Sequence, residues 1–145
     1  MKSFGKLYSK YYDKLYNSKN YIRETNFIIK LIKKFISIKD PLILELGSGT
    51  GGHALELVKK KYRIEGLERS KVMIKYFKKK NKKIKIYNQD MRTFNLKKKY
   101  DIILALFNVV NYLISINDFE KMVNSAKKHL NKNGIIIFDY WNTDA

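Results

Sequence analysis

The chain has 145 residues, of which 45% are hydrophobic, which is enough for one modest core and predicts a single domain over residues 1–145. It has no cysteine and two histidines, so disulfides, thiolate metal sites and cysteine nucleophiles are excluded, and we expect no metal site. The formal net charge of +18 raises nucleic acid as a partner, whereas the lack of any long apolar run predicts a cytoplasmic protein without membrane contact.

The first 40 residues are expected to be helical. Apolar residues recur at helical spacing over residues 21–36, and Asp40-Pro41 disfavours a further turn. Tyrosines recur between residues 8 and 21, and their rings could either pack against the core or cover a bound ligand. We therefore predict an N-terminal helical lid over residues 1–40 and a ligand-binding core over residues 41–145.

Beyond residue 41, short apolar segments alternate with amphipathic ones. The expected strands are residues 42–46, 62–68, 84–87, 100–107 and 134–141. Helical patterns follow Gly52 and Ser70, and a third covers residues 118–130. This alternation predicts an α/β fold, in which a parallel sheet has helices on both faces. Ligands in such folds bind beyond the carboxyl ends of the strands.

A glycine-rich segment follows the first expected strand. Glycines at positions 47, 49 and 51 allow a ligand to approach the backbone closely. Gly47, Gly49 and Gly52 also satisfy the G-x-G-x-x-G spacing of dinucleotide sites, and Glu68 lies about 20 residues further on, where an acid binds ribose. The segment therefore predicts an adenosine site without choosing the cofactor.

Two other acidic residues favour a cofactor without a pyrophosphate. The Glu45 carboxylate, at the end of the first strand, would repel a pyrophosphate but could engage an ammonium group. Asp90 and Met91 follow the third strand and offer a carboxylate beside an apolar side chain, which suits the amino group and the face of adenine. Glu45 could equally engage a water network, so these residues favour a cofactor that contains adenosine and no pyrophosphate.

These motifs resemble those of class I S-adenosylmethionine-dependent methyltransferases. The resemblance rests on E-x-G-x-G-x-G, on Glu68, on Asp90-Met91 and on the L-N-K-N-G-I-I-I-F-D run at residues 130–139. It implies a three-layer Rossmann-like methyltransferase sheet of five parallel strands in the order 3-2-1-4-5. More narrowly, Y-D-K-L-Y at residues 12–16, Tyr21 and the segments 66–70 and 90–92 resemble nucleotide-sugar N-methyltransferases and surface-polysaccharide methyltransferases.

The resemblance also implies roles for individual residues. The glycines would line the methionine and ribose portion of S-adenosylmethionine, Glu68 would bind ribose, and Asp90 with Met91 would hold adenine. The residues expected at the cofactor are Tyr12, Tyr21, Glu45, Gly47, Ser48, Gly49, Gly51, Glu68, Arg69, Asp90, Met91 and Phe107. Asn108 and Tyr112 are expected at the substrate, where relatives often carry a histidine, so no catalytic base is assigned.

The two histidines receive no catalytic role. His53 is expected in the first helical turn after the glycines, near the cofactor. His129 is expected close to a helix C-terminus, where the partial negative charge favours a cation.

The predicted function is methyl transfer to a small molecule such as an amino- or hydroxy-sugar. Alternatives are an RNA methyltransferase, a noncatalytic RNA-associated module, and an NAD-dependent oxidoreductase that rests only on the glycine spacing and Glu68. Lysines gather before the expected strands, at residues 59–61, 78–83, 97–99 and 127–132. These connections are expected at the sheet edge opposite the pocket, which makes nucleic acid a less favoured partner.

The last expected strand is apolar on both faces, as a central strand would be. Only four residues follow Trp141, whereas class I methyltransferases resemble one another in having two further strands. We expect either a chain that lacks the last two strands or a dimer formed through this exposed strand.

Overall fold

The computed structural model describes residues 6–16 and 18–141. The strands in this part are β1 (Leu42–Leu46), β2 (Arg63–Leu67), β3 (Ile86–Tyr87), β4 (Tyr100–Ala105) and β5 (Leu130–Phe138). The helices are α1 (Lys6–Leu15), α2 (Tyr21–Phe35), α3 (Gly52–Lys59), α4 (Lys71–Lys80) and α5 (Ile116–Lys128), with a short 3₁₀ helix η1 (Val109–Tyr112). None of the helices described here has the length and apolar character that a membrane span requires.

The strands form one parallel sheet in the order β3-β2-β1-β4-β5, which confirms the predicted order. β1 lies in the centre, with Glu45 in register with Gly66 of β2 and with Leu104 of β4. Because the strands are parallel, their carboxyl ends meet at one edge of the sheet. The predicted site residues that follow β1, β2, β3 and β4 are therefore brought to the same edge.

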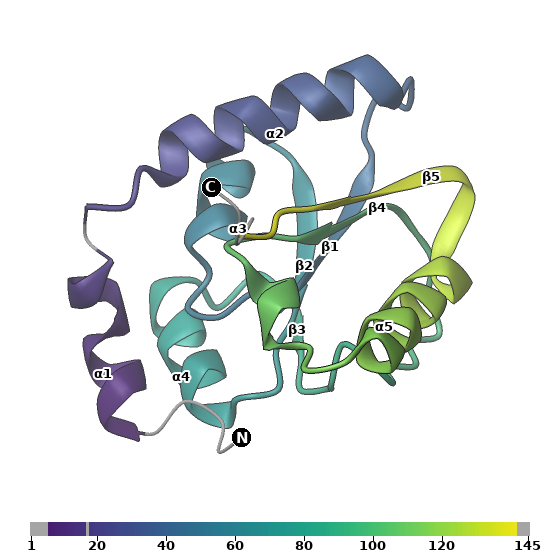
Figure 1. Cartoon of the computed structure of the whole chain (residues 1–145). Coiled ribbons are helices and arrows are strands. Elements are labelled where there is room, and N and C mark those ends of the chain that lie inside the picture. Colours follow the sequence, from purple (N-terminus) through teal and green to yellow (C-terminus); the bar gives the residue numbers. More distant parts are fainter. Residues whose placement is uncertain (1–5, 17, 142–145) are drawn as a thin grey trace.

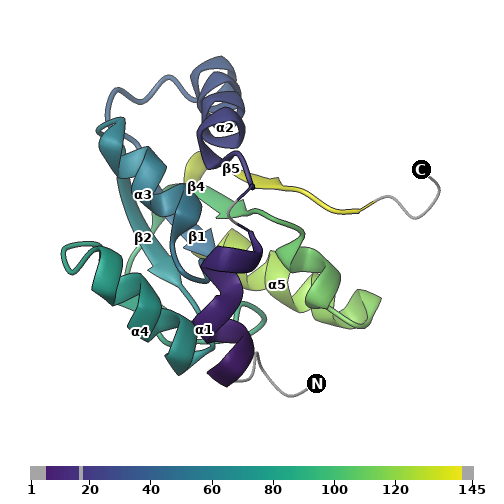
Figure 2. The same ribbon diagram turned by 90° about the vertical axis from the view of Figure 1, so that its left-hand side faces the viewer.

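Helices cover both faces of the sheet (Figures 1 and 2). On one face, buried residues of α2, α3 and α4 pack on Ile43, Ile64 and Ile102. On the other, Met122 and Ala126 of α5 pack on the opposite side chains of the same strands, such as Leu44 and Ile103. These three layers confirm the predicted α/β fold class.

Several element boundaries differ from the sequence expectation. β3 is confined to two residues, although four were expected. β4 ends at Ala105 because Phe107 and Asn108 adopt left-handed backbone conformations. α5 begins two residues earlier than expected, because Ser115 caps it by accepting a hydrogen bond from the amide of Asp118. The predicted cap of α4 by Ser70 is confirmed.

β5 lies at the edge of the sheet, as the predicted order requires, although its apolar sequence is that of a central strand. Its residues Ile135–137 are half-buried, and Phe138 is exposed. The residues after Trp141 lie outside the described part of the chain. Both the expected loss of two strands and the expected dimer through β5 stay predictions.

One lysine cluster departs from its expected place. Lys80 was expected at the sheet edge away from the pocket, but its ammonium lies 3.2 Å from Thr50 Oγ1 in the glycine-rich loop and 2.7 Å from Asp13 of α1. The C-terminal part of α4 packs against this loop, since a Cβ atom at Gly51 would lie 2.6 Å from the Phe77 ring. Positive charge therefore also borders the predicted pocket side, contrary to the expectation for residues 78–83.

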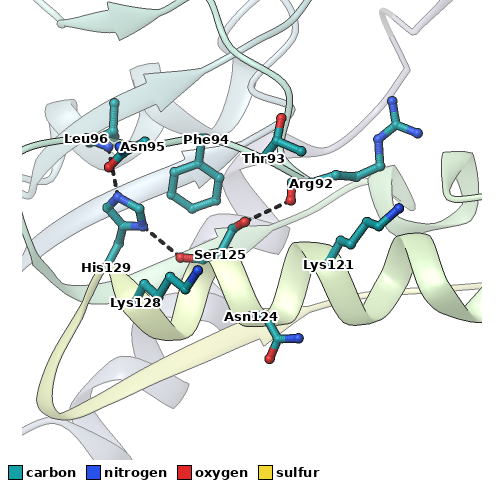
Figure 3. Close-up of a pocket in the computed structure, with 10 residues that line it drawn as sticks. All are labelled: Arg92, Thr93, Phe94, Asn95, Leu96, Lys121, Asn124, Ser125, Lys128 and His129. Carbon is teal, nitrogen blue, oxygen red and sulfur yellow. Dashed lines mark hydrogen bonds between the residues drawn. The ribbon is translucent and has the colours of Figure 1, made fainter.

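His129 is a buried structural residue and not the helix-terminal cation that the sequence suggested (Figure 3). Its Nε2 accepts a hydrogen bond from the amide of Leu96 at 2.8 Å, and its Nδ1 donates to the carbonyl of Ser125 at 2.7 Å. A ring nitrogen that accepts a hydrogen bond carries no proton, so this pattern requires the neutral imidazole. Through these two hydrogen bonds, the ring connects the loop before β4 to the end of α5.

Replacing His129 with leucine should destabilise the fold by about 1–3 kcal/mol, because the buried amide of Leu96 and the Ser125 carbonyl would both lose a partner. Urea denaturation measures this change in the free energy of unfolding. A variant as stable as the wild type would contradict the structural role given to His129.

Candidate cofactor site at the glycine-rich loop

The loop between β1 and α3 is held in an unusual backbone conformation. Gly47, Gly49 and Gly51 have φ angles of 62°, 53° and 85°, in the left-handed region that favours glycine. A Cβ atom at Gly47 would lie 2.1 Å from Val109 Cγ2, whereas one at Gly49 would have the Gly47 carbonyl oxygen, 3.9 Å away, as its nearest neighbour among the described residues. Gly47 is therefore required for packing, and Gly49 leaves the open face of the loop to a ligand.

Glu68 links this loop to the end of β2. Its carboxylate accepts hydrogen bonds from the amides of Gly49 at 3.0 Å and Ser70 at 2.7 Å. Burial raises the pKa of Glu68, and these backbone hydrogen bonds oppose that effect. The predicted ribose-binding acid thus lies directly beside the open glycine, and each of its oxygens has lone pairs left for further donors.

Two buried polar atoms beside the loop have no hydrogen-bond partner among the described residues. They are Oε2 of Glu45, at the end of β1, and Oγ of Ser48, inside the loop itself. Both side chains are almost fully buried. Because a buried polar atom without a partner costs free energy, this arrangement favours a ligand that supplies donors here.

The other oxygen of Glu45 belongs to a chain of charged side chains. His53 Nδ1 lies 3.4 Å from Glu45 Oε1, and His53 Nε2 lies 2.8 Å from Glu24 Oε2 on α2. Glu24 also pairs with Lys19 at 2.7 Å. Burial alone would lower the pKa of His53, but the hydrogen bonds with Glu24 and Glu45 outweigh it and raise this pKa to about 9.

The pair of His53 and Glu24 should make stability depend on pH. The pKa of His53 is raised from 6.5 to about 9. Its contribution to the free energy of unfolding is therefore complete below pH 6.5 and is lost as the pH rises through about 9. Mainly through its hydrogen bond with His53, the pKa of Glu24 falls from 4.5 to about 2, so its contribution is complete above pH 4.5 and is lost as the pH falls through about 2.

The stability difference between the wild type and His53→Gln should therefore be largest between pH 4.5 and 6.5 and should shrink above pH 9. Urea midpoints measured across this range provide the test. A difference that does not change with pH would mean that folding leaves the pKa of His53 unshifted and would contradict the ion pair with Glu24.

The Asp90 carboxylate, expected at adenine, is already engaged by arginines. Arg92 donates to it through Nε at 3.0 Å, Nη2 at 2.7 Å and its amide at 2.9 Å, and Arg69 approaches at 3.3 Å. The hydrogen bonds from Arg92 lower the pKa of Asp90 to about 2. These four donors match the lone-pair capacity of a carboxylate, so an adenine amino group would have to replace one of them. Met91 is half-buried next to Asp90.

An aromatic cluster surrounds Phe107, after the end of β4. The Phe107 ring contacts the rings of Tyr16 at 4.9 Å and Tyr12 at 6.5 Å, and the Lys19 ammonium lies 3.6 Å from its centre. The tyrosines come from α1 and the residue that follows it. The structure therefore brings the predicted Tyr12 and Phe107 together, about where the N-terminal segment meets the carboxyl edge of the sheet.

The remaining predicted residues lie on either side of this cluster. The Tyr21 ring lies over the glycine-rich loop, where it contacts the His53 ring at 5.0 Å and would collide with a side chain at Gly52. Asn108 caps η1, and Tyr112, at the end of η1, is 46% exposed. All these residues belong to segments that meet the carboxyl edge of the sheet.

Sequence reasoning missed three residues that shape the site. Lys19 and Glu24 are part of the charged chain described above, and nothing in their spacing marks them. Asp139, after β5, accepts hydrogen bonds from the amides of Phe107 and Asn108 and so holds both in their left-handed conformations. An acid directly after an apolar strand was the available signal for Asp139.

The chain matches a family model described as "Methyltransferase domain" over residues 43–134. It therefore belongs to this family of methyltransferase domains, and the predicted resemblance is confirmed. The match favours the methyltransferase interpretation over the nicotinamide alternative.

Individual relatives are sugar N-methyltransferases. The chain is 28% identical over 132 residues to a dTDP-3-amino-3,4,6-trideoxy-alpha-D-glucopyranose N,N-dimethyltransferase of Streptomyces venezuelae. This match covers 90% of the chain and 55% of that protein. The crystal structure of DesVI of S. venezuelae superposes with a TM-score of 0.85 at 26% identity, covering 92% of this chain and 57% of that one.

A second solved structure is an S-adenosylmethionine-bound amino pentose methyltransferase from Micromonospora echinaspora. This structure superposes with a TM-score of 0.83 at 25% identity, and the match covers 90% of this chain and 56% of the other one. The chain thus spans about half the length of the relatives that it matches. S-adenosylmethionine is the cofactor of this family.

Proposed function

We propose that this chain carries the S-adenosylmethionine-binding core of an enzyme that methylates an amino sugar on a nucleotide carrier. The observation that carries the proposal is the pair of buried, partnerless atoms, Glu45 Oε2 and Ser48 Oγ, beside the open face of Gly49. A cofactor with an ammonium group and a ribose offers donors of the kinds that Glu45, Ser48 and Glu68 accept.

The residues present fit this cofactor with one rearrangement. The Glu45 carboxylate is buried and would attract the ammonium at the amino-acid end of the cofactor. Glu68 has lone pairs left for ribose hydroxyls, and Met91 offers an apolar surface to adenine. Arg69 is the weakest of the four donors to Asp90 and is more than half exposed, so it is the one that adenine would replace.

S-adenosylmethionine supplies an activated methyl group on a sulfonium, and transfer is a displacement in line with the acceptor atom. The protein then contributes alignment and exclusion of water, not a nucleophile. Tyr12, Tyr16 and Phe107 present aromatic rings at the carboxyl edge of the sheet, and such rings attract cations by about 0.5–2 kcal/mol. An amine acceptor must also lose a proton, for which we assign no residue.

The acceptor class rests on the relatives, whose names specify dTDP-linked amino sugars. The test is to incubate the protein with S-adenosylmethionine and a dTDP-amino sugar and to detect the methylated product by mass spectrometry. The matched control is the same nucleotide sugar with a hydroxyl in place of the amino group. Methylation of the hydroxyl sugar alone, or of RNA but neither sugar, would reject the amino-sugar proposal.

A further inference from the structure

Four charged groups of alternating sign cross the interior from the Phe107 ring to β1. In order, they are the Lys19 ammonium, the Glu24 carboxylate, the His53 ring and the Glu45 carboxylate, joined by contacts of 2.7, 2.8 and 3.4 Å. The side chains of Lys19, His53 and Glu45 are 10%, 5% and 4% exposed. The proposed methyl transfer assigns a role to Glu45 but none to the other three.

The geometry of His53 requires a charged ring. Each ring nitrogen faces a carboxylate oxygen, and only the imidazolium carries a proton on both nitrogens. The ring thus donates a hydrogen bond to Glu24 of α2 and forms an ion pair with Glu45 of the sheet. Tyr21 adds an edge contact from its ring at 5.0 Å and no charge of its own.

Without this imidazolium, Glu45 would be a buried carboxylate with no positive neighbour among the described residues. Burial of a carboxylate without a positive partner costs free energy. In the structure, His53 engages Oε1 and leaves Oε2 without a partner. The histidine therefore pairs with one oxygen of the carboxylate, Oε1, and leaves the other, Oε2, to a ligand.

We infer that His53 is a positioning residue that holds the Glu45 carboxylate through Oε1 and orients Oε2 toward the ammonium of the bound cofactor. The inference rests on the proposed function, because it takes the cofactor to carry an amino-acid group. Glu24 and Lys19 extend the same arrangement to the N-terminal segment. The Lys19 ammonium contacts Phe107, so the charged chain connects the two ends of the candidate site.

The experiment compares two ligands that differ in the amino-acid end, which carries a carboxylate and the ammonium that Glu45 would bind. S-adenosylhomocysteine has the amino-acid end, and 5′-methylthioadenosine lacks it. Calorimetric titration of wild type and His53→Gln with both ligands should show that the variant loses about tenfold in affinity for S-adenosylhomocysteine, as expected when one charge-assisted contact is lost. Its affinity for methylthioadenosine should stay within about twofold, a difference well under 1 kcal/mol.

The matched control is His129→Gln, which alters the other buried histidine far from the loop. It should leave the ratio of the two affinities unchanged. If His53→Gln does not fold, Glu24→Gln replaces it, because Glu24 is 40% exposed and its replacement removes the carboxylate that pairs with His53. The ratio of the affinity for S-adenosylhomocysteine to that for methylthioadenosine should again fall. Equal losses for both ligands, or an unchanged ratio, would overturn the inference. A wild type that binds neither ligand would instead reject the proposed cofactor.

Discussion

Replacing Glu68 with alanine should weaken the binding of S-adenosylhomocysteine by roughly 100-fold, because two hydrogen bonds from ribose hydroxyls to a carboxylate would be lost at about 1.5 kcal/mol each. Glu68 lies beside the open face of Gly49 and is almost fully buried, so water would compensate little of this loss. Calorimetry measures the two affinities.

Alanine at this position also removes the acceptor for two loop amides, so a second variant separates the two effects. Glu68→Gln keeps an oxygen that can accept from Gly49 or Ser70 while it removes the charge. It should fold and still bind at least tenfold more weakly than wild type. The control is Glu120→Ala on the exposed surface of α5. An affinity of Glu68→Ala equal to that of this control would remove Glu68 from the cofactor site.

Replacing Gly47 with alanine should destabilise the protein by about 2–5 kcal/mol. The new Cβ would lie 2.1 Å from Val109 Cγ2, and overpacking of this kind costs about 1–3 kcal/mol. The left-handed backbone of Gly47 adds about 1–2 kcal/mol for any residue with a side chain. Urea denaturation measures the sum.

Gly49 provides the comparison for this prediction, because it has the same backbone conformation without the collision. Gly49→Ala should lose only about 1–2 kcal/mol of stability. It should nevertheless bind S-adenosylhomocysteine more weakly, since its methyl group would occupy the open face of the loop. If Gly47→Ala were no less stable than Gly49→Ala, the packing role of Gly47 would be wrong.

Most of the fold follows from local patterns in the sequence. The apolar segments that form β1 and β2 are bounded by Pro41, the glycine cluster and Ser70, and each of these boundaries has a local physical cause. The strand order came from the family resemblance, and the structure confirms it. The edge position of β5 followed from the resemblance and not from its own residues, because an apolar sequence does not distinguish a central strand from an edge strand.

The candidate site was predictable only where one segment carries the signal. The glycine-rich loop and Glu68 lie at recognisable positions after two strands. The contact between His53 and Glu24 joins residues that are 29 positions apart, and the contacts of Asp139 with Phe107 and Asn108 span 32 and 31 positions. Such pairs exist only after the sheet and the N-terminal helices have assembled, so no local pattern reveals them.

The engagement of Asp90 by Arg92 and Arg69 is a case of the same kind. A carboxylate beside an apolar residue suited adenine, but the sequence did not show that two arginines would already supply donors to it. Arg92 also reaches Asp118 of α5, which holds it in place. In the proposed site, adenine would reach Asp90 only by displacing Arg69, which is a property of the assembled site.

The most direct test of the proposed cofactor is a calorimetric titration of the wild-type chain with S-adenosylhomocysteine and, separately, with NADH. The arrangement of Glu45, Ser48 and Glu68 around Gly49 predicts saturable binding of S-adenosylhomocysteine at one site and no binding of NADH. Binding of NADH in preference to S-adenosylhomocysteine, or binding of neither by the folded chain, would contradict the proposal that this loop holds S-adenosylmethionine.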